Sequence, residues 1–133
     1  LTRIFTGLCE QVAADLQRKG YVGKTIGIKL RYADFKSVTR DQTLDSYTAD
    51  PKRIRHTAGQ CLKRVPLAQR LRLLGVRVGN LAKAGNPESY IRNMAFAQIE
   101  RAVEADLIGK TEGCEKDGEL PYKVKAVTYL SPQ

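Results

Sequence analysis

Hydrophobic and polar residues alternate along residues 24–32, which predicts a β-strand with one buried face and one open face. The apolar parity holds Ile26, Ile28, Leu30 and Tyr32. The other parity holds Thr25, Gly27, Lys29 and Arg31. The open face of this strand is therefore predicted to be cationic.

Three further segments have a strand pattern. Residues 37–44 follow a short link and form the second predicted strand. Residues 70–81 form a closing strand in which Leu74, Val76 and Val78 point inward and Gly75 and Arg77 lie on the opposite face. Residues 122–130 alternate in the same way, with Lys123 and Lys125 on the polar parity.

Three segments have helical spacing. Residues 3–19 carry an apolar stripe that ends at Gly20. Asp50 followed by Pro51 predicts the start of a second helix, which Pro66 ends. Apolar residues spaced along 88–107 predict a third helix. The stripe of that helix holds Ile91, Ala95, Ile99, Ala102 and Val103.

These elements predict an α+β fold, with a mainly antiparallel sheet of about four strands and helices packed on one face. Residues 1–81 contain most of this pattern and are expected to form one domain. Residues 82–133 add a helix and a strand of unknown role, which could complete the sheet.

The charge pattern narrows the range of partners. The 133 residues include 23 basic and 14 acidic side chains, for a net charge of +9. Residues 51–87 hold nine basic and no acidic residues. Such an excess is typical of nucleic-acid binders, although a solvated basic surface gives the same count. The polar side of the second helix is the segment where a solvated surface is the simpler interpretation.

Several function classes lack support in the sequence. Cys9, Cys61 and Cys114 are odd in number and far apart, which favours a reducing compartment over a disulfide framework. They do not have zinc-ligand spacing. His56 stands near no nucleophile or carboxylate pair, so we interpret it as a helix-surface residue. No apolar run or leader pattern indicates a membrane, and we expect a cytoplasmic protein.

Three short motifs occur in order: a strand ending in RYADF, a turn into KSVTRDQTL, and, after a helix, a closing strand with RLLGVRV. Together they resemble the little finger, the C-terminal DNA-binding domain of Y-family translesion DNA polymerases, especially the bacterial polymerase IV branch. The resemblance covers roughly residues 1–81. It implies a non-catalytic fragment that grips duplex DNA near the primer-template junction. No cofactor is expected in this chain, and magnesium is expected for the parent polymerase.

The candidate DNA contacts come from two sources. The strand parity indicates Lys29 and Arg31 as phosphate contacts. The resemblance adds residues that match basic, hydroxyl or glycine positions of the family. These are Thr39, Arg40, Arg72, Gly75 and Arg77. Gly27 and Gly75 would either admit a phosphate close to the backbone or mark β-bulges.

The sequence departs from the family at both ends. The first strand usual in the family is absent before residues 3–19, and we expect residues 122–130 to join the open sheet edge. They could do so within one chain or by exchange in a dimer. A sliding clamp is a possible partner of the parent protein, but no convincing clamp-binding peptide precedes Gln133.

Two other classes of function stay open. A stand-alone RNA- or protein-binding α/β module is the main alternative. RNA platforms of the sheet type use exposed aromatic residues, whereas the open parity here carries cations, threonine and glycine. An enzyme is the weakest alternative, because no catalytic constellation is visible.

Overall fold

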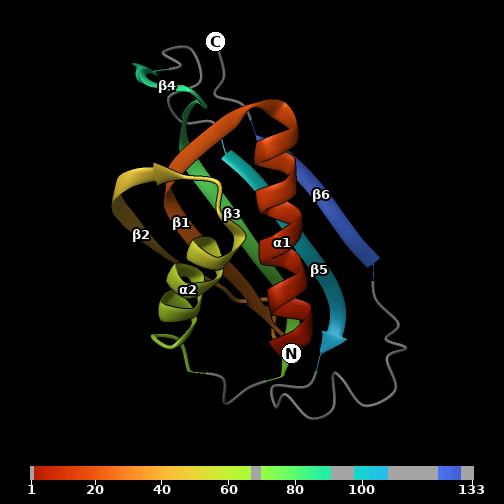
Figure 1. Cartoon of the computed structure of the whole chain (residues 1–133). Coiled ribbons are helices and arrows are strands. Elements are labelled where there is room, and N and C mark those ends of the chain that lie inside the picture. The colour runs from red at the N-terminus through yellow and green to blue at the C-terminus, as the bar shows by residue number, and fades with distance from the viewer. Residues whose placement is uncertain (1, 67–69, 91–97, 108–122, 130–133) are drawn as a thin grey trace.

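A computed structural model describes residues 2–66, 70–90, 98–107 and 123–129 (Figure 1). The elements in chain order are helix α1 (Thr2–Lys19), strands β1 (Tyr21–Tyr32) and β2 (Ser37–Thr48), helix α2 (Pro51–Leu62), and strands β3 (Leu71–Lys83), β4 (Asn86–Tyr90), β5 (Gln98–Leu107) and β6 (Lys123–Tyr129).

The strands form one sheet in the order β2-β1-β3-β5-β6, with β4 paired to the end of β3. Every pairing is antiparallel. The predicted α+β class is confirmed. The sheet of the described residues has six strands, more than the expected four, because the segment after residue 81 contributes strands of its own.

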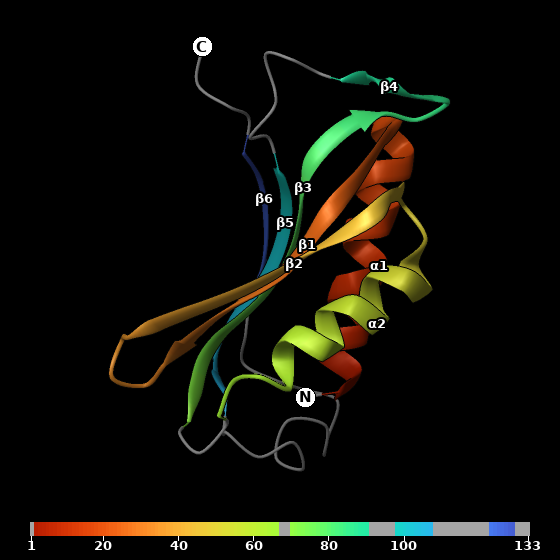
Figure 2. The same cartoon turned by 90° about the vertical axis from the view of Figure 1, so that its left-hand side faces the viewer.

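Both helices lie on the same side of the sheet (Figure 2). Helix α1 packs over β3 and β5, and α2 packs over β1 and β2. The core between them contains the inward residues expected from the alternation in β1 and β3, including Ile26, Ile28 and Val76. Cys9 and Cys61 are buried in this core, and burial raises the pKa of Cys9 to about 12.

The start of α2 follows the predicted signal. The carboxylate of Asp50 accepts a hydrogen bond from the backbone N–H of Lys52 at 3.1 Å, and Pro51 occupies the first turn. Such a cap satisfies a donor that the helix itself leaves unpaired. No described helix is long and apolar enough to cross a membrane.

The predicted helix over residues 88–107 is wrong wherever the structure describes it, because residues 88–90 belong to strand β4 and residues 98–107 form strand β5. Residues 91–97, which include Ile91 and Ala95 of the predicted stripe, lie outside the described residues. Ile99 and Val103 are buried on the helix side of the sheet, and they fit the spacing of a helix and of a strand equally well. The alternation of β5 is hidden in the sequence by Arg101, a charged residue that lies between them. Residues 98–107 form a strand because they pair with β3. The spacing of apolar residues within one segment does not reveal such a pairing.

Arg101 is accommodated by an ion pair that joins β5 to α1. Its Nε donates to Oδ2 of Asp15 at 2.6 Å, and its second guanidinium nitrogen donates to Oδ1 at 2.9 Å. Arg18 donates to the same Oδ1 at 2.8 Å. The hydrogen bonds from Arg101 lower the pKa of Asp15, although burial acts in the opposite direction.

Strand β6 confirms that the alternating segment near the C-terminus joins the main sheet. It pairs with β5 of its own chain, at the edge opposite β2. Lys125 pairs with Ala102 and Lys123 with Glu104, two residues at open-face positions of β5. Residues 122 and 130, the ends of the predicted strand, lie outside the described residues.

Candidate nucleic-acid interface

The sheet face opposite the helices carries a group of cations and hydroxyls at the β1–β2 hairpin. Lys29 pairs with Thr39 of β2, and Arg31 pairs with Ser37. Paired residues of neighbouring strands share a face, so these four side chains lie together. Arg31 also donates from Nε to the hydroxyl of Ser37 at 3.3 Å. We call Lys29, Arg31, Ser37 and Thr39 the basic corner.

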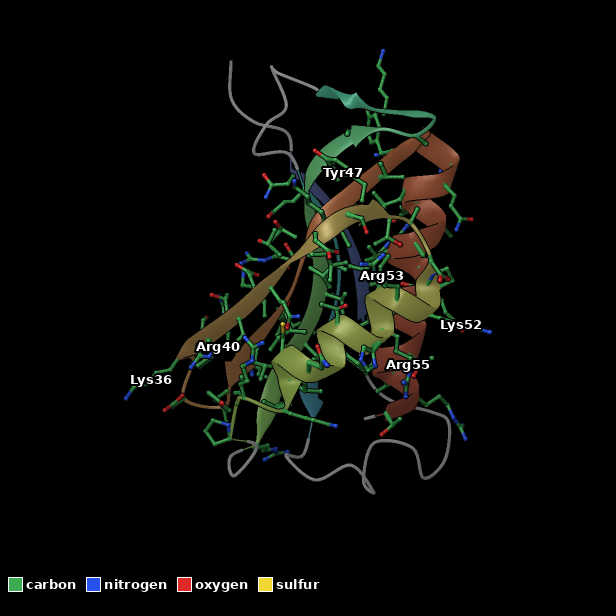
Figure 3. All side chains as sticks on the ribbon, turned by 60° about the vertical axis from the view of Figure 1, so that its left-hand side comes forward. Lys36, Arg40, Tyr47, Lys52, Arg53 and Arg55 are labelled. Atoms are coloured by element: carbon green, nitrogen blue, oxygen red, sulfur yellow. The ribbon has the colours of Figure 1, made fainter. Side chains whose placement is uncertain are left out.

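Arg40 does not belong to this face. It pairs with Ile28, which lies in the core beneath the helices. The next residue of the same parity, Gln42, accepts a hydrogen bond from Arg64 just beyond α2 at 2.8 Å. The exposed Arg40 side chain therefore lies on the helix side of the sheet (Figure 3). Neighbouring residues of a strand point to opposite faces, so Thr39 and Arg40 cannot both line the open face.

Arg77 lies on the open face, but an acidic partner holds it. Its two nitrogens donate to Oδ1 of Asp41 at 3.1 and 2.9 Å, and one of them donates to Oδ2 at 2.8 Å. Asp41 and Arg77 are the two cross-strand partners of Gly27. The ion pair thus spans three strands. Sequence reasoning missed Asp41, although its parity matches that of Thr39.

Two glycines of the open face, Gly27 and Gly75, serve close packing within the protein. A Cβ atom on Gly27 would overlap Oδ1 of Asp41 and lie 2.8 Å from the carbonyl oxygen of Arg40. A Cβ atom on Gly75 would lie 3.2 Å from Oε2 of Glu100. Both glycines occupy regular pairs, so neither is a β-bulge. At Gly27, the space proposed for a phosphate is occupied by the Asp41 carboxylate.

Arg72 contacts an aromatic ring at the end of the β1–β2 hairpin. Arg72 lies at the point of β3 where the pairing register shifts against both β1 and β5. Its guanidinium carbon is 4.7 Å from the ring centroid of Phe35, within the range of a cation–π contact. The Nε atom of Arg72 is buried and has no hydrogen-bond partner among the described residues. The resemblance gave no role to Phe35.

The open face becomes acidic toward β5. Glu100 pairs with Arg77, and Glu104 pairs with Leu73, so both acids occupy open-face positions. Glu100 is buried and Glu104 is partly exposed. Among strands β1, β2, β3 and β5, the positive charge of this face is concentrated at the hairpin, and β6 adds Lys123 and Lys125 at open-face positions on the other side of these acids. The face as a whole is therefore not cationic in the way that the first strand alone suggested.

The cations of α2 do not share one side of the helix: Lys52 points away from the sheet (Figure 3), Arg53 reaches strand β2, and Arg55 reaches α1. Arg53 donates to Ser46 at 2.9 Å, and Arg55 donates to Thr6 at 2.8 Å. Lys52 is exposed, and so is His56 as predicted, with its ring 3.2 Å from the amide of Gln60. These contacts agree with a solvated helix surface.

Comparisons with known proteins extend over both the hairpin and β5. A family model described as the impB/mucB/samB family C-terminal domain matches residues 1–111. DNA polymerase IV of Streptococcus suis is 39% identical over 74 residues, which are 55% of this chain and 21% of that protein. DNA polymerase IV 1 of Mesorhizobium japonicum is 32% identical over 109 residues, which are 79% of this chain and 25% of that protein. The chain thus spans a quarter or less of these relatives.

Proposed function

This chain belongs to the impB/mucB/samB C-terminal domain family, the C-terminal domain of Y-family DNA polymerases, and from that premise we propose that it grips duplex DNA. The resemblance seen in the three sequence motifs is confirmed at the level of the family. In this proposal the chain contributes no catalytic group. Magnesium, nucleotides and translesion synthesis belong to the parent polymerase, in the bacterial cytoplasm, and a sliding clamp is a partner of that parent.

The basic corner is the observation that carries the proposal. Lys29 and Arg31 offer cationic donors, and Ser37 and Thr39 offer hydroxyl donors, on a face that no described helix covers. Cations and hydroxyls on one exposed surface are the usual protein contacts to phosphate oxygens. Such contacts hold the duplex in position and do not select its sequence. We place the contacted duplex beside the primer-template junction.

The alternative of an RNA-binding sheet platform has less support. Binding of that kind uses aromatic residues on the sheet face, on which bases stack. The open-face positions of the central strands β1 and β3 hold no aromatic residue over the matched pairs from Thr25–Gly79 to Arg31–Leu73. A duplex backbone, which needs cations and not rings, fits this face better.

We expect the chain to bind duplex DNA with micromolar or weaker affinity that falls steeply as salt rises, because phosphate contacts release counterions. The base sequence of the duplex should have little effect on affinity. Fluorescence anisotropy with two unrelated duplexes over a range of salt concentrations measures both properties. A salt-independent affinity, or a strong preference for one duplex, would contradict the proposal.

We expect Lys29→Ala and Arg31→Ala each to weaken duplex binding about threefold and to reduce the salt slope by about one unit. Lys52→Ala removes the same charge from the far side of α2 and is the matched control. Arg40→Ala should also have a smaller effect, because this residue lies on the helix side. Equal losses in all four variants would mean that a diffuse field, and not the basic corner, binds DNA.

A further inference from the structure

Phe35 occupies an energetically unfavourable position at the tip of the β1–β2 hairpin, which extends away from the helices (Figure 2). Among the described residues it is the one exposed large hydrophobic side chain, with 62% of its surface accessible. Its backbone φ is +70°, a left-handed conformation that is unfavourable for a residue with a side chain. Strain and exposure together, with no gain in core packing, are features of functional sites.

The ring is held from one side only. The guanidinium of Arg72 lies 4.7 Å from the ring centroid and covers one face. Because most of Phe35 is exposed, the second face of the ring is open to solvent. A planar ligand could therefore stack on it and extend the arrangement to three layers, namely ligand, ring and guanidinium.

The hairpin tip is ordered by its own hydrogen bonds. The backbone N–H of Tyr32 donates to the carbonyl of Lys36 at 2.9 Å, and that of Phe35 donates to the carbonyl of Tyr32 at 2.8 Å. The Asp34 carboxylate accepts from the N–H of Lys36 at 3.1 Å. A further bond of 2.9 Å, from Ala33 to the carbonyl of Arg70, ties the tip to the chain before β3. The ring is thus held in place before any ligand binds.

The charges around the ring favour an anionic ligand. Lys36 follows Phe35 and extends outward (Figure 3), and the basic corner begins two residues later, at Ser37. Asp34 is the one acid of the turn, and its carboxylate is used by the backbone of Lys36. An apolar protein segment would gain little from these cations, whereas a nucleotide offers a planar base and a phosphate together.

We propose that Phe35 and Arg72 form a stacking site for an unpaired nucleobase of single-stranded DNA, with Lys36 near its phosphate. The inference rests on the proposed function, since it places the unpaired base next to the duplex held by the basic corner. Bases stack on aromatic side chains with little dependence on sequence. The site would therefore detect that a strand is unpaired and not which base it carries.

The test compares a blunt duplex with the same duplex carrying a short tail of unpaired thymidines, and with the free thymidine oligonucleotide. Binding of each probe to the chain is measured by fluorescence anisotropy. Wild type should bind the tailed duplex about tenfold more tightly than the blunt one, as expected for one stacked base. Phe35→Leu, which keeps an apolar side chain but has no aromatic face, should remove that preference.

Phe35→Tyr is the matched control and should keep the preference, while urea denaturation verifies that each variant is folded. Arg72→Lys keeps the charge without the planar group and should reduce the preference in part. An unchanged preference in Phe35→Leu, or no preference in wild type, would overturn the inference even if blunt duplex binds. Phe35-dependent binding of the oligonucleotide without binding of blunt duplex would support the stacking site and contradict the proposed grip on duplex DNA.

Discussion

Replacing Asp15 with asparagine is expected to lower the free energy of unfolding by about 3 kcal/mol, the range found when one partner of a buried ion pair is removed. Asp15 is 5% exposed and accepts two hydrogen bonds from Arg101 on β5. The asparagine side chain would keep the size of the aspartate but leave the guanidinium without its counter-charge beneath α1. Urea denaturation, with the slope compared between variants, measures the loss.

Arg18→Ala is the control for this effect. Arg18 donates to the same carboxylate, but its side chain is 67% exposed, and we expect a loss of less than about 0.5 kcal/mol. Since Asp15 has a lowered pKa, its extra stability is fully present above the ordinary value of 3.8. The advantage of wild type over Asp15→Asn should shrink as pH falls through the lower, folded-state pKa. If the difference in unfolding free energy between wild type and Asp15→Asn stayed constant down to the pH of acid unfolding, the ion pair would not be the cause of that difference.

Replacing Asp41 with asparagine is expected to strengthen duplex binding about tenfold and to steepen the salt dependence by about one unit. The carboxylate accepts hydrogen bonds from two nitrogens of Arg77, one at each oxygen, in a fork geometry that phosphate also accepts. Asp41 therefore competes with DNA for the central cation of the open face. Asparagine removes the negative charge and leaves Arg77 able to turn toward a phosphate. The measurement is the same anisotropy titration.

Asp45→Asn removes the same charge from the same strand and serves as the control. Its side chain is 97% exposed and faces Arg53 of α2 at 3.5 Å. It should change duplex affinity much less than Asp41→Asn. The double variant Asp41→Asn with Arg77→Ala should lose the gain. If both aspartate variants gained equally, overall charge and not release of Arg77 would be responsible.

Local patterns in the sequence predicted most elements correctly. The alternation at Ile26, Ile28 and Leu30 and the cap at Asp50 each depend on a few neighbouring residues. Pairing partners were harder to infer, because they depend on residues far apart in the chain. Arg101 shows this: as an isolated charge it interrupts the apolar parity of β5, and only Asp15, on another element, explains its inward position.

The candidate site was predicted in part for the same reason. The parity of β1 correctly placed Lys29 and Arg31 on the open face. Arg40 was assigned a role because it matches a family position, and the strand register was not considered. The structure places Arg40 on the helix side of the sheet. The parity of β2 was sufficient to place Asp41 on the open face with Thr39, whereas its proximity to Arg77 depends on the register that pairs both residues with Gly27.

The central position of β3 affects how this chain folds. β3 pairs with β1 on one side and with β5 on the other, and the segment between β1 and β3 contains both β2 and α2. The β1–β2 hairpin can close within microseconds, whereas joining β1 to β3 requires a longer loop to close first. Assembly of the sheet, and with it the face that would meet DNA, therefore waits for contacts between distant parts of the chain, as in other mixed α/β domains, which fold more slowly than helical bundles.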